Sequence, residues 1–152
     1  MRRKREIQNE IRWSMPSLSV NEGMARAMIA AFCAQVNPTA TEIADIKCAV
    51  SEAVTNCIVH AYRDTVGEIR LTARLLSDGE GGVLVEVEIK DRGCGIPDID
   101  CARQPLYTTD AEGERSGMGF TVMESFTDRL SVSSRVGYGT SVVMYKKLNG
   151  RR

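Results

Sequence analysis

The sequence has 152 residues, with 20 lysines and arginines against 20 aspartates and glutamates, so its formal net charge at pH 7 is zero. A hydrophobic share of 43% and a charged share of 26% predict one globular domain spanning 1–152. This balance excludes the overall basic field of a nucleic-acid-binding protein, and no apolar run reaches the roughly 20 residues of a membrane span.

The basic start of the chain, residues 1–5, is not followed by an apolar segment. Neither a signal peptide nor a membrane anchor is therefore expected, and residues 1–8 are expected to be flexible. The chain has five cysteines, an odd number, and none of them form a CxxC pair. With no export signal, this pattern predicts reduced thiols in a cytoplasmic protein. A zinc site would need closely spaced ligands and more than one histidine, and is not expected.

The first half of the chain predicts a strand and a helix. Residues 9–17 alternate apolar and polar side chains up to Pro16, which either ends the strand or places it at a sheet edge. Residues 19–36 predict a helix with Ser19 or Asn21 as its N-cap. Its apolar stripe is expected to comprise Met24, Ala27, Met28, Ala31 and Phe32.

A second helix is predicted over residues 37–62, with Thr41 as N-cap and Glu42 and Asp45 as acids of the first turn. Its core face is expected to comprise Ile43, Ile46, Val50, Ala53, Val54, Cys57 and Ala61.

The second half predicts two hairpins. Residues 68–76 and 83–90 alternate around the turn 77–82, and residues 129–135 and 140–148 form a second pair. Between them lie an irregular region of roughly 30 residues, with one short helical piece near 98–104, and a third helix over 120–128. The order predicts an α+β fold, with three helices on one face of a largely antiparallel sheet.

Three groups of residues could carry chemistry. On the second helix, Glu52 and Asn56 lie four residues apart, on a line roughly 110 to 150° from the centre of the core face. A solvated polar stripe explains this pair as well as a site does. His60, the single histidine, is nearer the core edge and is interpreted as a boundary residue.

The second group is Asp91, at the end of a strand, with Gly93 and Gly95 after it. An acid at a strand end can accept a hydrogen bond from a ligand's amino group, and the glycines let the backbone approach a flat ligand. A glycine turn with a capping aspartate remains the alternative. The acids do not match the spacing of a calcium loop.

The third group is a GxxxGxG pattern, Gly113, Gly117 and Gly119, which leads directly into a helix. Bare backbone N–H groups at a helix N-terminus favour phosphate, and Arg115 adds a cation there, unless it is simply a solvent-facing side chain. The spacing fits neither the Rossmann nor the Walker pattern.

In this order, the three motifs resemble the GHKL ATP-binding superfamily, whose Bergerat fold is a two-layer α/β sandwich with a mixed, mostly antiparallel sheet. The segments 51–56, 102–109 and 114–120 look like those of the bacterial anti-sigma-factor serine kinases, and most like the sporulation anti-sigma-F type. The resemblance runs from near Ser17 to the last strand and implies an ATP lid over 98–116.

The resemblance also implies roles. Asn56 would hold Mg²⁺ against the phosphates of ATP, Glu52 would be the general base, and Asp91 would receive the adenine amino group, supported through water by Thr140. Arg115 would lie near the γ-phosphate as a second catalytic residue. Further nucleotide contacts are implied for Gly93, Gly95, Gly113, Gly117, Met118 and Gly119.

The implied function is a protein-serine kinase that phosphorylates an anti-anti-sigma factor. In its ATP form it would also bind and inhibit a sporulation sigma factor of the sigma-F type. A nucleotide-gated anti-sigma binding module without kinase activity is the main alternative, and an ATP hydrolase, in which Glu52 activates water, is a weaker one. Because the chain ends at Arg152 without a second domain, the topoisomerase and sensor-kinase types are not expected.

Two surfaces complete the expectations. A homodimer is expected through the edge strand 9–15 and the uncovered sheet face, because an open apolar edge invites pairing. Glu22 and Arg26, at i and i+4 on the first helix, are expected to bind protein partners. An intrahelical ion pair between them is the alternative.

Overall fold

Five strands form one antiparallel sheet in the computed structural model, which describes residues 5–104 and 119–149. The sheet order is β1-β2-β3-β5-β4, and every neighbouring pair is antiparallel. The strands are β1 (Ile7–Pro16), β2 (Glu68–Ser77), β3 (Val83–Asp91), β4 (Arg129–Arg135) and β5 (Gly139–Leu148).

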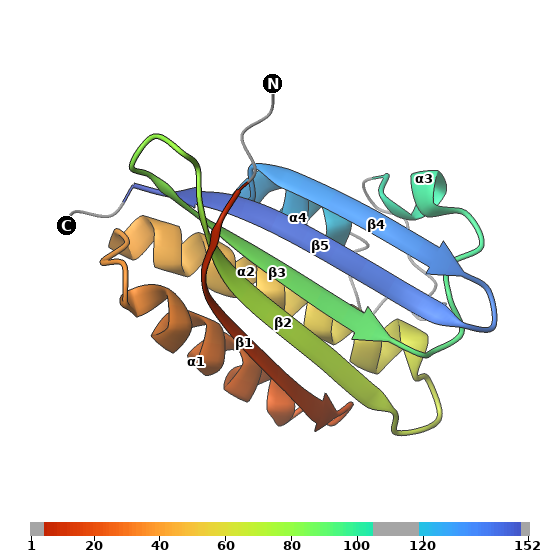
Figure 1. Ribbon diagram of the computed structural model, residues 1–152. Helices are drawn as coiled ribbons and strands as arrows, with labels where there is room; N and C mark the ends of the chain where they lie inside the picture. The colour runs from red at the N-terminus through yellow and green to blue at the C-terminus, as the bar shows by residue number, and fades with distance from the viewer. Residues whose placement is uncertain (1–4, 105–118, 150–152) are drawn as a thin grey trace.

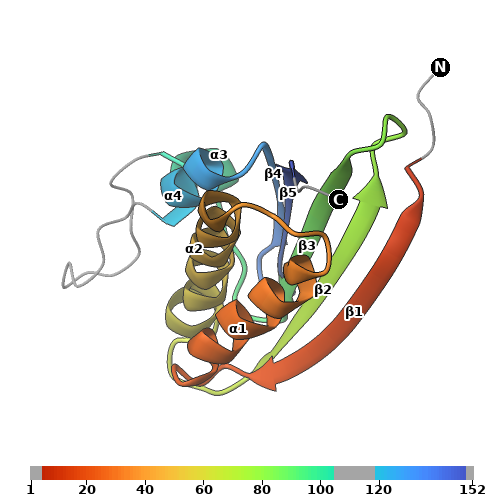
Figure 2. The same cartoon turned by 90° about the vertical axis from the view of Figure 1, so that its left-hand side faces the viewer.

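The helices are α1 (Asn21–Ala34), α2 (Ala40–Asn56), the π-helical turn η1 (Cys57–Ala61), α3 (Ile99–Ala102) and α4 (Gly119–Phe126). Helices α1, α2 and α4 lie on one face of the sheet, and none of the described helices lies on the other face (Figures 1 and 2). The predicted two-layer α+β fold is therefore confirmed, with a fully antiparallel sheet among the described strands. In the described part of the chain, no helix is long and apolar enough to cross a bilayer.

Strand β1 lies at the edge of the sheet, and Pro16 is its last residue. Both alternatives predicted from Pro16 are therefore confirmed. It begins earlier than expected, because Ile7 already pairs with Leu76 and the Glu6 carbonyl accepts a hydrogen bond from Ser77 N at 2.8 Å. Residues 7 and 8, which were expected to belong to a flexible segment over 1–8, are part of β1.

Helix α1 buries a face that overlaps the predicted stripe only in part. Phe32 is buried as predicted and Met28 is half-buried, but Met24 is 57% exposed and Ala27 and Ala31 are also exposed. The other residues that enter the core are Ala25, Ile29 and Cys33. Both sets have helical spacing, so periodicity could not separate them. Packing of α1 against α2 and the sheet selects the set that contains Ile29, because this side chain removes more apolar surface from water than Ala27 or Ala31 would.

The N-terminus of α1 also differs from the prediction. Val20 is the N-cap residue and provides no side-chain cap, while the Asn21 side chain donates to the Pro16 carbonyl at 2.9 Å. Neither Ser19 nor Asn21 caps the helix.

Helix α2 starts with a capping box rather than with the predicted Thr41 cap. The Thr39 hydroxyl accepts from Glu42 N at 3.1 Å, and the Glu42 carboxylate accepts from Thr39 N at 2.8 Å. The Thr-x-x-Glu spacing signals this arrangement, in which two unpaired backbone donors are satisfied at once. The predicted core face of α2 is confirmed: Ile46, Val50, Ala53, Val54 and Cys57 are buried, and Ile43 and Ala61 pack against the core.

Candidate functional site

The Glu52–Asn56 pair meets the third glycine motif. Both side chains are half-buried near the end of α2. Gly119, the first residue of α4, lies so close that a Cβ built on it would be 3.3 Å from Asn56 Oδ1 and 3.5 Å from Glu52 Oε2. Two segments far apart in the sequence therefore place a carboxylate, an amide and a bare backbone side by side.

The α2 helix widens into η1 directly after Asn56. A π-helical turn inserts an extra residue per turn and is frequent at functional sites. Its first residue, Cys57, is buried and lies against the end of β3, where its thiol donates to Asp91 Oδ2 with an S–O distance of 3.5 Å. Burial raises the pKa of Cys57 well above its usual value, and the nearby Asp91 carboxylate raises it further, so the thiol stays protonated.

Asp91 is held from three sides. Its Oδ1 accepts from Gly93 N at 2.9 Å and from Thr140 N at 3.2 Å, while Oδ2 accepts from Cys57. Desolvation raises the pKa of Asp91, and these hydrogen bonds offset only part of the shift. The result is a half-buried carboxylate of fixed orientation that retains acceptor capacity on Oδ2.

The two glycines after Asp91 are required by close backbone contacts. A Cβ on Gly93 would lie 2.4 Å from the Ala61 carbonyl oxygen of η1. Gly95 has φ +79°, and a Cβ there would lie 2.4 Å from the Arg135 carbonyl oxygen at the end of β4. The loop after β3 is thereby packed between η1 and the β4–β5 turn.

Asp91, Thr140 and Ser134 form a row of paired residues across the neighbouring strands β3, β5 and β4. Thr140 pairs with Asp91 across β3 and β5, and with Ser134 across β5 and β4. Paired residues of neighbouring strands face the same side of a sheet, and this is the side of buried Ile69, which pairs with Asp91. The row therefore faces the helix layer, at the end of the sheet where η1 and Cys57 lie.

Comparison with known proteins identifies the family of the chain. Residues 15–146 match the family described as the histidine kinase-like ATPase domain. The chain belongs to the histidine kinase-like ATPase family. It is 49% identical over 147 residues to the anti-sigma F factor of Caldanaerobacter subterraneus subsp. tengcongensis, with 97% of this chain and 99% of that protein covered.

A second relative, the anti-sigma F factor of Geobacillus stearothermophilus, is 46% identical over 140 residues, which cover 92% of this chain and 93% of the relative. Among solved structures, the RsbU and RsbW domains of Rv1364c from Mycobacterium tuberculosis share the fold, with a TM-score of 0.68 and 22% identity over 95% of this chain and 34% of that one. The sensor histidine kinase MprB, from a mycobacterium, matches with a TM-score of 0.53 and 13% identity over 93% of this chain and all of that chain.

An ATPase domain binds nucleotide, so nucleotide is the ligand class of this fold. In this ATPase fold, an acceptor at the end of β3 suits the amino group of a base, and oxygen donors on α2 suit a phosphate-bound cation. Among the described residues, no cluster of three or more histidine, cysteine or acidic side chains is close enough to hold a metal ion by itself. A metal here would therefore depend on phosphate and water oxygens as well as on the protein.

Several predicted site residues lie outside the described part of the chain: Gly113, Arg115, Gly117 and Met118, and with them most of the expected lid over 98–116. The described start of that segment contains α3 (Ile99–Ala102), capped by the Asp98 carboxylate, which accepts from Cys101 N at 3.0 Å. Arg103, directly after α3, pairs with Glu124 of α4.

The predicted partner residues on α1 have separate surroundings. Glu22 accepts a hydrogen bond from the Ser51 hydroxyl, which ties α1 to α2 one residue before Glu52. Arg26 is exposed and takes part in no ion pair within 5–104 and 119–149. The intrahelical pair that the sequence left open is therefore not formed, and Arg26 is available on the surface of the ATPase domain.

Sequence reasoning missed two residues of the site. Cys57 was assigned to the core and Ser134 to a strand, and each has a hydrogen bond to a predicted site residue, Asp91 or Thr140. Neither position carries a motif. Only the register of β4 against β5, and the widening of the helix at η1, bring them there.

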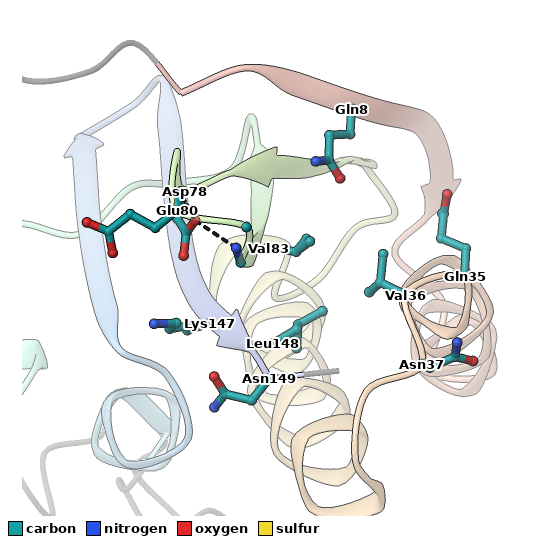
Figure 3. Close-up of a pocket in the computed structure, with 12 residues that line it drawn as sticks. Gln8, Gln35, Val36, Asn37, Asp78, Glu80, Val83, Lys147, Leu148 and Asn149 are labelled. Atoms are coloured by element: carbon teal, nitrogen blue, oxygen red, sulfur yellow. Dashed lines mark hydrogen bonds between the residues drawn. The ribbon is translucent and has the colours of Figure 1, made fainter. Parts of the chain in front are cut away.

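A hollow of about 590 Å³ lies at the end of the sheet opposite Asp91, and none of the predicted site residues that the structure describes lines it (Figure 3). It lies between the end of α1, the β2–β3 turn and the end of β5. Asp78, which lines it, already accepts hydrogen bonds from Glu80 N and Gly82 N, both at 2.8 Å. The residues that line this hollow belong to none of the three predicted motifs.

Proposed function

We propose that the chain is a protein-serine kinase that uses ATP to phosphorylate an anti-anti-sigma factor, and that its ATP form binds and inhibits a sporulation sigma factor of the sigma-F type. The observation that carries the kinase part is the placement of Gly119 beside both Glu52 and Asn56, where an added Cβ would touch each side chain. The sigma-factor part is supported by the names of the relatives, which match this chain over nearly their whole length.

In this proposal, Asp91 receives the amino group of adenine and Thr140 supports it, while Gly93 and Gly95 let the base approach the backbone. A carboxylate at hydrogen-bond distance from an amino group excludes bases that present a carbonyl there, because two acceptors repel each other. The half-buried position of Asp91 strengthens this selection, since electrostatic interactions are less screened away from water.

Mg²⁺ fits the residues present. Asn56 offers an amide oxygen beside the bare backbone of Gly119, and Mg²⁺ prefers oxygen ligands while it retains several waters. When bound, the ion would neutralise phosphate charge. Asn56 would hold it, and the remaining ligands would come from phosphates and water.

Glu52, one helical turn before Asn56, is the proposed general base. It would take the proton of the substrate serine while the serine oxygen forms a bond to the γ-phosphorus and the bond from that phosphorus to the β–γ bridging oxygen breaks, releasing ADP. A module that only binds nucleotide has no use for a carboxylate at this position. Arg115 remains a prediction as the cation near the γ-phosphate, outside the described residues.

One experiment tests the proposal. The protein is incubated with γ-labelled ATP and Mg²⁺, alone and with a purified anti-anti-sigma factor, and in parallel with a sigma factor and either ATP or ADP. Label on a serine of the anti-anti-sigma factor, and ATP-dependent capture of the sigma factor, are expected. Capture without label transfer would instead identify a binding module, and release of phosphate without any partner would identify a hydrolase.

We also propose a homodimer that uses β1 and the helix-free face of the sheet. That face carries an ionic row in which Arg74 of β2 bonds to Glu10 of β1, at 2.5 Å, and to Glu86 of β3, at 2.7 Å. A surface of alternating charges can pair with a copy of itself around a two-fold axis. Light scattering should give twice the chain mass, and a monomer mass at micromolar concentration would remove this part of the proposal.

A further inference from the structure

Ser134 connects three parts of the site through one hydroxyl group. Its Oγ accepts from Ile96 N at 2.7 Å, donates to the Gly139 carbonyl at 3.0 Å, and lies 2.8 Å from Thr140 Oγ1. Ile96 belongs to the loop after Gly95, and Gly139 starts β5. Ser134 therefore lies where the loop after β3 meets the β4–β5 hairpin.

The three contacts are compatible with only one assignment of protons. A serine hydroxyl has one proton and two lone pairs. The Gly139 carbonyl can only accept, so it takes the Ser134 proton, and Ile96 N–H occupies one lone pair. The contact with Thr140 is then a hydrogen bond only if the Thr140 hydroxyl donates its single proton to the second lone pair of Ser134.

This assignment determines what Thr140 offers to a ligand. Within residues 5–104 and 119–149, Ser134 is the one hydrogen-bond partner of the Thr140 hydroxyl. With its proton directed at Ser134, Thr140 Oγ1 presents lone pairs alone to the site. Beside it, the Asp91 carboxylate is also an acceptor. Both side chains thus accept, so the ligand, directly or through a bridging water, must supply the protons.

We propose that Ser134 is a specificity-determining residue of the nucleotide site, which keeps Thr140 an acceptor and thereby selects a 6-amino purine over a 6-oxo purine. The inference rests on the proposed nucleotide site and adds to it a residue that never needs to touch the base. An amino group at position 6 brings two N–H donors to Asp91 and Thr140, whereas an oxo group brings none. Without Ser134, the Thr140 proton becomes free to turn towards a 6-oxo group.

Calorimetric titration of the full chain with ADP and with IDP, which differ at position 6 and in the proton on N1, tests the inference. The parent should prefer ADP. In Ser134→Ala, the ratio of the IDP to the ADP dissociation constant should fall roughly three- to tenfold, the value of about one neutral hydrogen bond. Ser133→Ala, one residue earlier on the opposite face of β4 and exposed, should leave the ratio unchanged.

A Thr140→Val background separates specificity from a purely structural role. If Ser134 acts through Thr140, then Ser134→Ala should not change the ratio further once the Thr140 hydroxyl is gone. If Ser134 only braces the loop through Ile96 and Gly139, its loss should weaken ADP and IDP equally in both backgrounds, which would overturn the inference. Parent protein that binds neither nucleotide would instead refute the proposed function, so the two failures are distinguishable.

Discussion

The two ends of the sheet differ in how each holds an aspartate. At the end formed by Asp91 and Thr140, hydrogen bonds join residues far apart in the sequence, such as Cys57 with Asp91 and Asp91 with Thr140. At the other end, around the hollow in Figure 3, Asp78 bonds to backbone groups two and four residues away. The bonds of Asp78 lie within one turn, whereas those from Cys57 and Thr140 fix Asp91 where η1, β3 and β5 meet.

The difference also appears in the ionisation of the two aspartates. Burial raises the pKa of Asp91, while hydrogen bonds from Glu80 N and Gly82 N lower the pKa of Asp78. The raised pKa means that folding disfavours the charged form of Asp91. The lowered pKa means that folding favours the charged form of Asp78. The end with the unfavourable charge is the one that a ligand's amino group would compensate.

The largest expected effect comes from Glu52→Gln. Serine phosphorylation should fall about 10²-fold or more, because a general base is lost, while ADP affinity stays near that of the parent. Radiolabel transfer and calorimetry measure the two quantities. Glu80→Gln, at the opposite end of the sheet, is the matched control and should transfer phosphate normally. Undiminished transfer by the Glu52 variant would show that this acid is structural.

Asp91→Asn should weaken the binding of ADP by about 1 to 3 kcal/mol, because the amino group of adenine loses a charged acceptor. In the parent, the free energy of unfolding falls as pH rises through the raised pKa of Asp91, because the half-buried carboxyl becomes charged. Asparagine does not ionise, so the variant has no such loss. The free energy of unfolding of the ligand-free variant at pH 7 should therefore equal or exceed that of the parent in urea titrations.

Asp78→Asn is the control for this pair. Because the pKa of Asp78 is lowered on folding, its charged form stabilises the folded protein at pH values above the pKa of the unfolded state. This stabilisation is lost as pH falls through the pKa of Asp78 in the folded protein. The variant should therefore be less stable than the parent at pH 7 and should bind ADP normally. If Asp91→Asn binds ADP as tightly as the parent does, the base lies elsewhere.

Arg26→Glu probes whether partner recognition belongs to the α1 surface near Glu52. It should weaken binding of the sigma factor, of the anti-anti-sigma factor or of both by about 1 to 3 kcal/mol, in the range of a lost interface arginine, without changing the affinity for ADP. Lys147→Glu makes the same charge change at the distal hollow and should leave both partners bound. Surface plasmon resonance with ATP present measures the affinity for each partner. Equal affinities of the parent, Arg26→Glu and Lys147→Glu would show that Arg26 is a solvated surface residue with no role in partner binding.

The smallest expected effect is a pH dependence. ADP affinity should decline as pH falls through the raised pKa of Asp91, since the protonated carboxyl loses acceptor strength. The same titration with Asp91→Asn removes contributions from the phosphates, so the difference between the two curves reports Asp91. Parallel curves would mean that this carboxyl does not face the ligand.

Most of the fold could be predicted from local patterns. Strict alternation in residues 68–76 and 83–90 predicted the β2–β3 hairpin, and helical periodicity predicted the core face of α2. The three motifs and their order predicted Glu52, Asn56 and Asp91 as site residues, and the contact of Gly119 with the first two is consistent with that. These signals are local, because a strand or helix repeats its period along the chain.

Other features depended on packing between distant segments. Periodicity allowed two faces for α1, and only its contacts with α2 and the sheet selected Ala25 and Ile29 over Met24. The hydrogen bonds of Cys57 and Ser134 depended on the π-helical turn and on strand register. The sequence alone determined which elements form and which chemistry they carry, since both follow from residue type and spacing. The tertiary structure decided which side chains meet, because a hydrogen bond between distant residues exists only once the sheet has set its register.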